Sequence, residues 1–265
     1  MPGPNHIQAD AHQIIEEFVD AYSENTQSVR RYIPVVKAPR DTIQALAVKY
    51  DTTAINLETA NGSPVEITIT KSANTVPVVD LSGKSPSIAI RYYESPDVVK
   101  THTELLLEQF LQNENRLVVT ALDNTTGVND IAVDTTVNTQ PADVYDVYSA
   151  VKRAIRNINQ YVTSNMFMII AEDSEEYLDK STPELKTAYD LLERRGIPVI
   201  THDGISDCAY LLPRTPNVAK LVQVNPLEIK LEQEPYDLAA VFGTEAVAFV
   251  VNQPKIIQKL DFRIE

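Results

Sequence analysis

The sequence is short of glycine, cysteine and basic residues, and each shortage excludes a class of protein. Only seven of 265 residues are glycine, which is well under half of the roughly 7% average usage. No G-x-G-x-x-G, Walker or G-x-S-x-G motif occurs, so neither a glycine-lined phosphate site nor a nucleophile elbow is expected. The single cysteine, Cys208, excludes an intrachain disulfide framework and any site with several thiolate ligands.

Basic residues are outnumbered, since 23 lysines and arginines face 37 aspartates and glutamates, giving a formal charge of −14. A nucleic-acid reader normally carries a basic patch, whereas the basic residues here are scattered. With 43% hydrophobic and 23% charged residues, the chain has enough apolar side chains to build a core. We therefore expect a globular protein with one large domain or two closely connected ones.

Long apolar runs are absent as well. The longest, such as 166–171 and 246–251, are far shorter than the ~18 residues that a membrane-spanning helix requires. The N-terminal residues contain neither the basic region nor the apolar region of a secretion signal. These patterns predict a protein that is made and assembled in the cytoplasm.

The N-terminal part of the chain predicts a helix followed by an extended arm. Residues 9–29 have apolar side chains at helical spacing with acids between them, namely Ile14, Ile15, Phe18, Val19 and Tyr22. Residues 30–40 contain Pro34 and Pro39 around an apolar run, which disfavours a helix and favours extended chain. Such an arm needs a surface on which to lie.

Residues 42–93 predict a long β ribbon. Alternating apolar and polar residues with many β-branched side chains favour strands, and the pairs Asn61-Gly62 and Ser82-Gly83 are typical of hairpin turns. The alternation makes one face of the ribbon polar. Because a two-stranded ribbon is only marginally stable alone in water, we expect it to rest on another surface, such as a neighbouring copy of the chain.

The next segment predicts a long helix that serves as a structural spine. Ser95, Pro96 and Asp97 provide an N-cap, a proline at the first helical position and an acid in the first turn. No glycine or proline follows before Leu122, so the helix should have roughly 25 residues and a length of about 37 Å. Its apolar stripe contains Val98, Val99, Leu105, Leu106, Leu107, Phe110 and Leu117.

The remaining chain alternates helices and strands. Residues 123–142 predict a loop or weak strands, and a second helix should begin at Asp143 with Val144, Val147, Val151, Ile155, Ile158 and Val162 on its apolar side. A continuously apolar run at 166–171 predicts a strand buried on both faces. Helices are expected at 174–180 and at 183–195, the latter with Leu185, Tyr189 and Leu192 inward and Gly196 as its stop. Strands are expected at 197–201, 227–232, 246–251 and 256–262.

This order of elements resembles the Hong Kong 97-type capsid fold, as do the segments RRGIPVITHDGISD at 194–207 and GTEAVAFVVNQPKIIQKLDF at 243–262. That α+β fold is shared by the major capsid proteins of tailed viruses and by encapsulin shells. The resemblance covers nearly the whole chain and rests on element order and loose patterns. Where the family often has a Pro-x-Ala turn, this chain has Pro254-Lys255-Ile256.

The resemblance implies four parts. They are an N-terminal arm (1–45), an extended loop or β ribbon (46–93), a peripheral domain with a long spine helix (94–142 and 223–265) and an axial domain (143–222). In the family a loop of the axial domain lies at symmetry axes, and 201–217 is the matching segment here. The ribbon would lie over an adjacent subunit and the arm would cross below it, which accounts for two segments without a core of their own.

The same resemblance implies a structural function. The expected protein is a major capsid protein that assembles as hexamers and pentamers into an icosahedral shell around double-stranded DNA, in the virion of a tailed virus. Its partners would be other copies of itself, a portal and a decoration or scaffolding protein, with assembly in the host cytoplasm, no membrane and no sequence-specific DNA binding. The net charge of −14 fits either a wall that does not adhere to DNA or a high-salt environment that screens like charges.

Two alternatives stay open at the level of sequence. An encapsulin, which is a cellular nanocompartment around an enzyme cargo, would use an N-terminal helix to form an apolar pocket for a cargo peptide, and residues 9–22 could supply that helix. A small cytosolic α/β enzyme would use His202 and Cys208, six residues apart in an expected loop, as base and thiol nucleophile. The competing interpretation of Cys208 is a thiol without a catalytic role.

The other ionisable residues each allow a chemical and a structural interpretation. His6, His12, His102 and His202 show no metal-ligand spacing, and His6 with His12 could be either a metal pair or solvated tail residues. Glu16-Glu17 and Glu175-Glu176, with Asp173 nearby, could form an acid–base pair or a solvated face.

The basic residues likewise allow two interpretations. Lys152, Arg153 and Arg156 could contact phosphate or pair with acids of a neighbour. Lys71 and Lys84 lie in the expected ribbon, where some family members crosslink a lysine to an asparagine; non-covalent locking is expected here. The shell interpretation thus predicts no catalytic, cofactor-binding or metal-binding residues and no cofactor.

Overall fold

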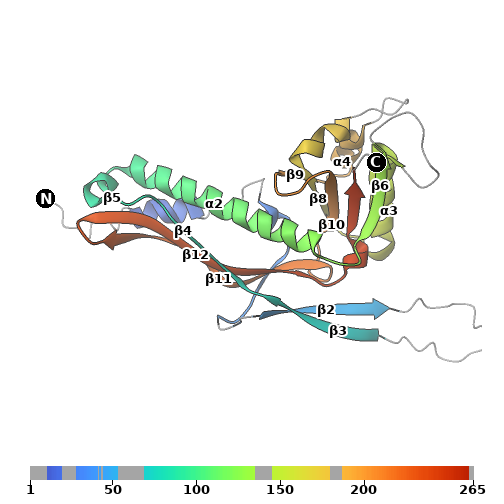
Figure 1. Ribbon diagram of the computed structural model, residues 1–265, viewed down its shortest axis with the longest axis horizontal. Coiled ribbons are helices and arrows are strands. Elements are labelled where there is room, and N and C mark those ends of the chain that lie inside the picture. Colours follow the sequence, from blue (N-terminus) through green and yellow to red (C-terminus); the bar gives the residue numbers. More distant parts are fainter. Residues whose placement is uncertain are drawn as a thin grey trace, which may run out of the picture.

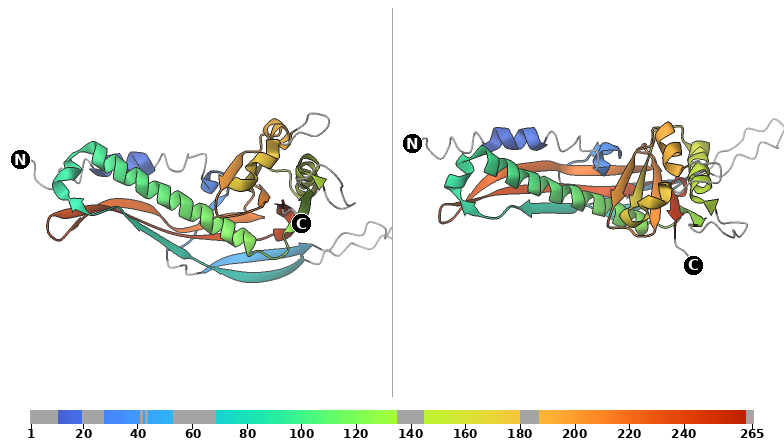
Figure 2. Two further views of the ribbon diagram at one scale, coloured as in Figure 1. Left: turned by 45° about the horizontal axis from the view of Figure 1, so that its top comes forward. Right: turned by 90° about the horizontal axis from the view of Figure 1, so that it is seen from above.

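A long helix lying along a long β hairpin sets the shape of the molecule (Figure 1). The protein is described by a computed structural model, which covers residues 11–19, 28–40, 42, 44–52, 69–134, 145–179 and 187–262. The helix, α2, spans Pro96–Asp123, and the hairpin consists of β11 (Ala219–Glu234) and β12 (Leu238–Val251). Figure 2 shows that these elements form an elongated body with a second sheet at one end.

The predicted spine helix is confirmed, and it begins at Pro96. Ser95 occupies the N-cap position in an extended conformation, but its side chain makes no capping hydrogen bond, so the start rests on Pro96 and on Asp97 in the first turn. The 28 residues of α2 give a length of about 42 Å at 1.5 Å per residue. The prediction that Leu105 belongs to the apolar stripe is wrong, since its side chain is 49% exposed.

The first sheet has five strands in the order β1 (Val35–Lys37), β11, β12 and β4 (Val79–Lys84), with β5 (Ile88–Ala89) also paired to β12. β1 runs parallel to β11, while the other pairs are antiparallel. The register of β11 against β12 shifts on both sides of Asn225, and Pro226 lies in this irregular stretch, where a strand tolerates proline. After β5 the chain turns into the 3-10 helix η2 (Ile90–Glu94) instead of the expected strand.

The prediction of a hairpin turn at Ser82-Gly83 is wrong, because both residues lie inside β4. Gly83 is in register with Gly243 of β12, and both face α2. A Cβ atom on Gly83 would lie 2.6 Å from Leu106 Cδ1, and one on Gly243 would lie 2.7 Å from Phe110 Cε2. The two glycines therefore allow the spine helix to approach the sheet closely, and neither serves as a turn residue.

The second sheet has six strands, and its buried side chains belong to the larger of the hydrophobic cores. Its order is β7 (Tyr145–Asp146), β6 (Asn129–Asp134), β13 (Gln258–Asp261), β10 (Cys208–Pro213), β8 (Met166–Ala171) and β9 (Val199–His202). Every residue of β8 is buried, as predicted, and so is every residue of β10. The expectation of a loop throughout 201–217 is wrong, because residues 208–213 form the strand between β13 and β8.

Helices cover this second sheet (Figure 1). The helix α3 (Val147–Tyr161) begins later than the predicted Asp143, because residues 145–146 pair with β6, and the Asp146 side chain caps it by accepting from the backbone N–H of Ser149 at 2.8 Å. A 3-10 segment, η3 (Glu172–Asp179), and a short helix, α4 (Ala188–Arg194), follow. Gly196 has φ +64° and ends α4, as predicted.

One prediction about the α4 region differs from the structure. Tyr189, expected inward, is 46% exposed, whereas Leu192 is buried as expected. Leu185 lies outside the described residues, as do Tyr22, Val144 and the Asn61-Gly62 turn. The domain boundaries expected from the resemblance assign 129–134 and 258–261 to the peripheral part, whereas these strands pair within the six-stranded sheet.

The arm and the ribbon are attached at the edges of this body. Residues 11–19 are helical, and Ile15 is buried in a second core with Leu106 and Phe110 of α2. The 3-10 segment η1 (Val29–Arg31) leads to β1. The ribbon consists of β2 (Gln44–Thr52) and β3 (Ile69–Pro77), which form a separate two-stranded sheet that projects from the body (Figure 1). A last 3-10 segment, η4 (Pro254–Ile256), separates β12 from β13.

Candidate functional site

A buried ionic cluster centred on Arg30 holds the N-terminal arm to the body. The backbone N–H of Val29 donates to Asn115 Oδ1 of α2 at 3.1 Å. Arg30 Nη2 donates to Glu114 Oε1 of α2 and to Glu245 Oε1 of β12. The cluster therefore joins the arm, the spine helix and the long hairpin at one point.

The charged groups of this cluster are removed from water. The side chain of Arg30 is 12% exposed, and those of Glu114 and Glu245 are fully buried. Gln223 Nε2 also donates to Glu245 Oε1, at 3.1 Å, while Glu245 Oε2 has no hydrogen-bond partner among the described residues. Burial alone would lower the pKa of Arg30, but the two carboxylates raise it above its ordinary value, so the guanidinium stays charged.

Part of this cluster has a signal in the sequence. Glu114 lies four residues after Phe110 and four before Val118, so a charge falls within the apolar stripe of α2. A buried charge requires a partner. That partner, Arg30, is 84 positions away, and no local pattern indicates it.

The structure does not bring His202 and Cys208 together as a base and a nucleophile. His202 Nδ1 accepts a hydrogen bond from the backbone N–H of Gly204 at 2.7 Å and lies 3.6 Å from Asp203 Oδ1. Cys208 is buried at the start of β10, in register with Asp261 of β13. Burial lowers the pKa of His202, so the neutral ring serves as an acceptor that closes the turn between β9 and β10.

The other histidines also have local roles. His102 Nδ1 lies 2.7 Å from the hydroxyl of Tyr93, and this contact joins α2 to η2. Burial lowers the pKa of His102. His12 Nε2 lies 3.2 Å from Glu16 Oε1, one helical turn away, with both side chains exposed. His6 lies outside the described residues. Within the described part of the chain, no group of three histidine, cysteine or acidic residues could hold a metal ion.

The remaining charged candidates lie mainly on the surface. Glu16, Glu17, Glu175 and Glu176 are exposed, as are Asp173 and the basic residues Lys152, Arg153 and Arg156. Asp173 Oδ1 accepts from Ser174 Oγ at 2.8 Å and from the backbone N–H of Asp207 at 3.4 Å. Lys84 pairs with Glu234 of β11; the side chain of Lys71 lies outside the described residues.

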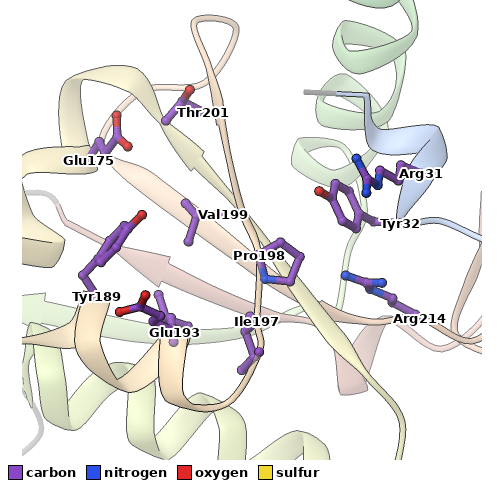
Figure 3. A pocket seen from close by; sticks show the side chains of 12 residues that line it. Arg31, Tyr32, Glu175, Tyr189, Glu193, Ile197, Pro198, Val199, Thr201 and Arg214 are labelled. Atoms are coloured by element: carbon purple, nitrogen blue, oxygen red, sulfur yellow. The ribbon is translucent and has the colours of Figure 1, made fainter. Parts of the chain in front are cut away.

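Two pockets lie beside the arm. The first, of about 610 Å³, lies between η1 and the β9 edge of the six-stranded sheet. Figure 3 shows Arg31, Tyr32 and Arg214 at one end of it and Glu175, Tyr189 and Glu193 at the other. The second, of about 490 Å³, lies between the helix at 11–19 and β11, and its wall combines Ile15, Val19, Leu227 and Ile229 with His12, Glu16, Glu228 and Lys230. No helix in the described ranges is long and apolar enough to cross a membrane.

Comparison with known proteins gives matches in structure only. No protein-family model matches the sequence, and no curated protein matches it. Among solved structures, the virus-like particle from Pyrococcus furiosus superposes with a TM-score of 0.66 at 15% identity, covering 94% of this chain and 98% of that one. The capsid of the native GTA particle superposes with a TM-score of 0.65 at 12% identity, covering 91% of both chains.

A third solved structure, the capsid of Myoviridae phage XM1, superposes with a TM-score of 0.51 at 12% identity, covering 90% of this chain and 92% of that one. All three matches cover at least 90% of this chain. Likeness at these identities establishes the fold.

Proposed function

From its Hong Kong 97-type capsid fold, we propose that this chain is a major capsid protein that assembles as hexamers and pentamers into an icosahedral shell around the double-stranded DNA of a tailed virus. The observation that carries the proposal is the likeness to capsid chains over at least 90% of this chain, at nearly full coverage of theirs. The proposed role is structural. His202 accepts a hydrogen bond in the turn after β9, and Cys208 is buried at the start of β10, so the two do not form a base and a nucleophile.

The projecting segments supply the means of assembly. The ribbon touches the body at its base, where Ala45 packs with Val222, Ala248 and Val250, and from there it runs as a separate two-stranded sheet (Figure 1). A two-stranded ribbon needs further contacts to be stable, and an adjacent subunit would provide them. Each subunit then contacts several neighbours, so modest interfaces add up to a stable closed shell.

The four parts of the subunit follow in this proposal. The arm is 1–45, the extended loop 46–93, the peripheral domain 94–142 with 223–265, and the axial domain 143–222. The strands β6 and β13 fall within the peripheral ranges, but we assign them to the axial domain instead, because they complete its sheet. Assembly would take place in the host cytoplasm, with a portal and a decoration or scaffolding protein as further partners and the virion as the final location.

Electron microscopy of the purified protein, together with sedimentation over a range of salt concentrations, tests the proposal. We expect closed shells of uniform diameter. Monomers or small oligomers under every condition would instead favour a small α/β enzyme and overturn the shell function. Double-stranded DNA that is protected from nuclease inside particles from the native source would show that the shell encloses a genome.

Truncation separates the role of the arm in assembly from its role in the fold. Removing 1–27 leaves Arg30 and its cluster in place, whereas removing 1–30 also deletes Arg30. We expect subunits lacking 1–27 to fold, with a lower stability because Ile15 no longer packs on Leu106 and Phe110, and to close shells poorly. Normal shells from this truncation would show that residues 1–27 have no part in assembly.

One observation favours a second candidate, an encapsulin that encloses an enzyme cargo. The groove between the helix at 11–19 and β11 has a volume of about 490 Å³ and contains an apolar strip of Ile15, Val19, Leu227 and Ile229, and the Pyrococcus furiosus particle is among the matching structures. A folded enzyme inside the purified particles, and no protected DNA, would decide for this candidate. Replacing Val19 and Leu227 by serine would then release the cargo and leave the shell intact.

A further inference from the structure

One pocket of this acidic protein has two arginines at the same end. Arg214, which follows β10, places its Cζ 4.6 Å from the ring centroid of Tyr32, and Arg31 Cζ lies 6.0 Å from the same centroid. The Tyr32 ring in turn stacks on Phe167 of β8, with the ring centroids 5.9 Å apart and an angle of 19° between the planes. The aromatic pair thus fixes the place of both guanidinium groups on the pocket wall (Figure 3).

Arg214 lacks an anionic neighbour in the described part of the chain. Its Nε is buried and has no hydrogen-bond partner among the described residues. Burial lowers the pKa of Arg214, Tyr32 raises it and the charge of Arg31 lowers it again, while no carboxylate contributes. An unsatisfied buried N–H on a charged group is costly, and an oxyanion entering the pocket would satisfy it with a charge-assisted bond.

The opposite end of the pocket restricts what kind of anion fits. Glu175 and Glu193 line that end, together with the exposed ring of Tyr189, and Ile197, Pro198 and Val199 lie between the two ends (Figure 3). These acids would repel a polyanion such as DNA. A protein segment that presents one carboxylate to the arginines and a polar or basic group to the glutamates would complement both ends.

Building on the proposed shell function, we propose that this pocket is the docking site for a carboxylate-bearing segment of a second copy of this chain, held by Arg214 and Arg31 beside Tyr32. A second copy fits because its 37 acidic residues outnumber its 23 basic ones, so its surface is rich in the required group. Arg31 and Tyr32 belong to η1 whereas Arg214 follows β10. The docked segment would therefore hold the arm against the six-stranded sheet as two subunits meet.

Site-specific photocrosslinking in assembled particles tests the occupant. Tyr189 lines the pocket and is 46% exposed, so a benzoylphenylalanine in its place keeps an aromatic ring there. We expect a crosslinked peptide from another subunit that contains an aspartate or glutamate. Crosslinks only within one chain, crosslinks to DNA, or none at all would overturn the docking site.

Charge variants test the chemistry. Arg214→Gln should raise the subunit concentration needed for half-maximal assembly about tenfold and weaken its dependence on salt, because a partly desolvated charge pair is lost. Arg214→Lys should lie between wild type and Arg214→Gln, since it keeps the charge without the planar fork. The control Arg91→Gln, at an exposed residue of η2, should stay within about twofold of wild type. Equal effects of Arg214→Gln and Arg91→Gln would contradict the proposal.

The outcomes distinguish the two proposals. Particles that form without the intersubunit crosslink overturn the docking site and leave the shell function standing. A protein that stays monomeric under all conditions overturns both.

Discussion

Replacing Arg30 by alanine should destabilise the subunit more than the loss of any surface arginine. In the folded protein Glu114 and Glu245 are fully buried and both bond to the guanidinium of Arg30. Arg30→Ala would leave two carboxylates in the interior without a counter-charge. Removing one partner of a buried ion pair costs about 3–5 kcal/mol, which is a large fraction of a typical folding free energy of roughly 5–15 kcal/mol.

Urea unfolding of the dilute, monomeric protein, followed by circular dichroism, measures this loss. With an m-value of about 3 kcal/mol per molar urea, a loss of about 4 kcal/mol lowers the midpoint by about 1.3 M. The control Arg156→Ala, on the exposed face of α3, should change the free energy of unfolding by less than about 0.5 kcal/mol.

The pH dependence and a compensating variant sharpen the test. Without Arg30 the buried carboxylates acquire pKa values above their ordinary ones. The folded state then binds protons more readily than the unfolded state, so the deficit should shrink as the pH falls from 7 towards about 5. Arg30→Met combined with Glu114→Gln and Glu245→Gln should recover most of the loss. An Arg30→Ala midpoint equal to that of the control, or a triple variant no better than Arg30→Ala, would refute the buried cluster.

Three further predictions concern the spine and the histidines. Gly243→Ala should lower the free energy of unfolding in urea by about 1–3 kcal/mol, because the added Cβ would lie 2.7 Å from Phe110 Cε2. Gly127→Ala is the control for backbone strain without a clash, because its φ is +84° and its Cβ would meet only Pro254 Cγ, at 3.9 Å. Leu106→Pro should break α2 at a cost of ~3 kcal/mol or more and abolish particles in electron microscopy, so normal particles would contradict the assignment of the spine. Burial lowers the pKa of His202 below its ordinary 6.5. The unfolded chain therefore binds the proton at a higher pH than the folded protein does, and the free energy of unfolding should fall as the pH drops below 6.5. His202→Asn should reduce this pH dependence to the part due to His102, and a pH profile equal to that of wild type would contradict the role of His202 as a buried acceptor.

The elements that the sequence predicts well are those whose signals are local. Pro96 and Asp97 mark the start of α2, and the continuous apolar run defines β8. Both signals depend on residues within one element, because a helix start with proline at its first position and a buried strand are specified by their own side chains. The order of such elements also indicated the fold that the solved capsid structures match.

The predictions that fail depend on contacts between distant segments. Gly83 has the same sequence signature as a turn glycine, yet its role is set by Leu106, which lies across from it on α2. The strand β10 is missed because its place between β13 and β8 is a property of the sheet. The site residues show the same limit, since Arg30 and Arg214 acquire their roles from residues that the fold brings near them.

The join between the ribbon and the first sheet has a mechanical consequence. β3 leads into β4 with only Val78 between them, and β4 pairs with β12 from Lys84↔Phe242 to Val79↔Val247. A tensile load on the ribbon along the strand direction would act in shear on these hydrogen bonds, which lie perpendicular to the strands and would bear the load together. β12 continues through η4 to β13 in the six-stranded sheet. Load applied at the ribbon would thus pass along strands to the far end of the molecule.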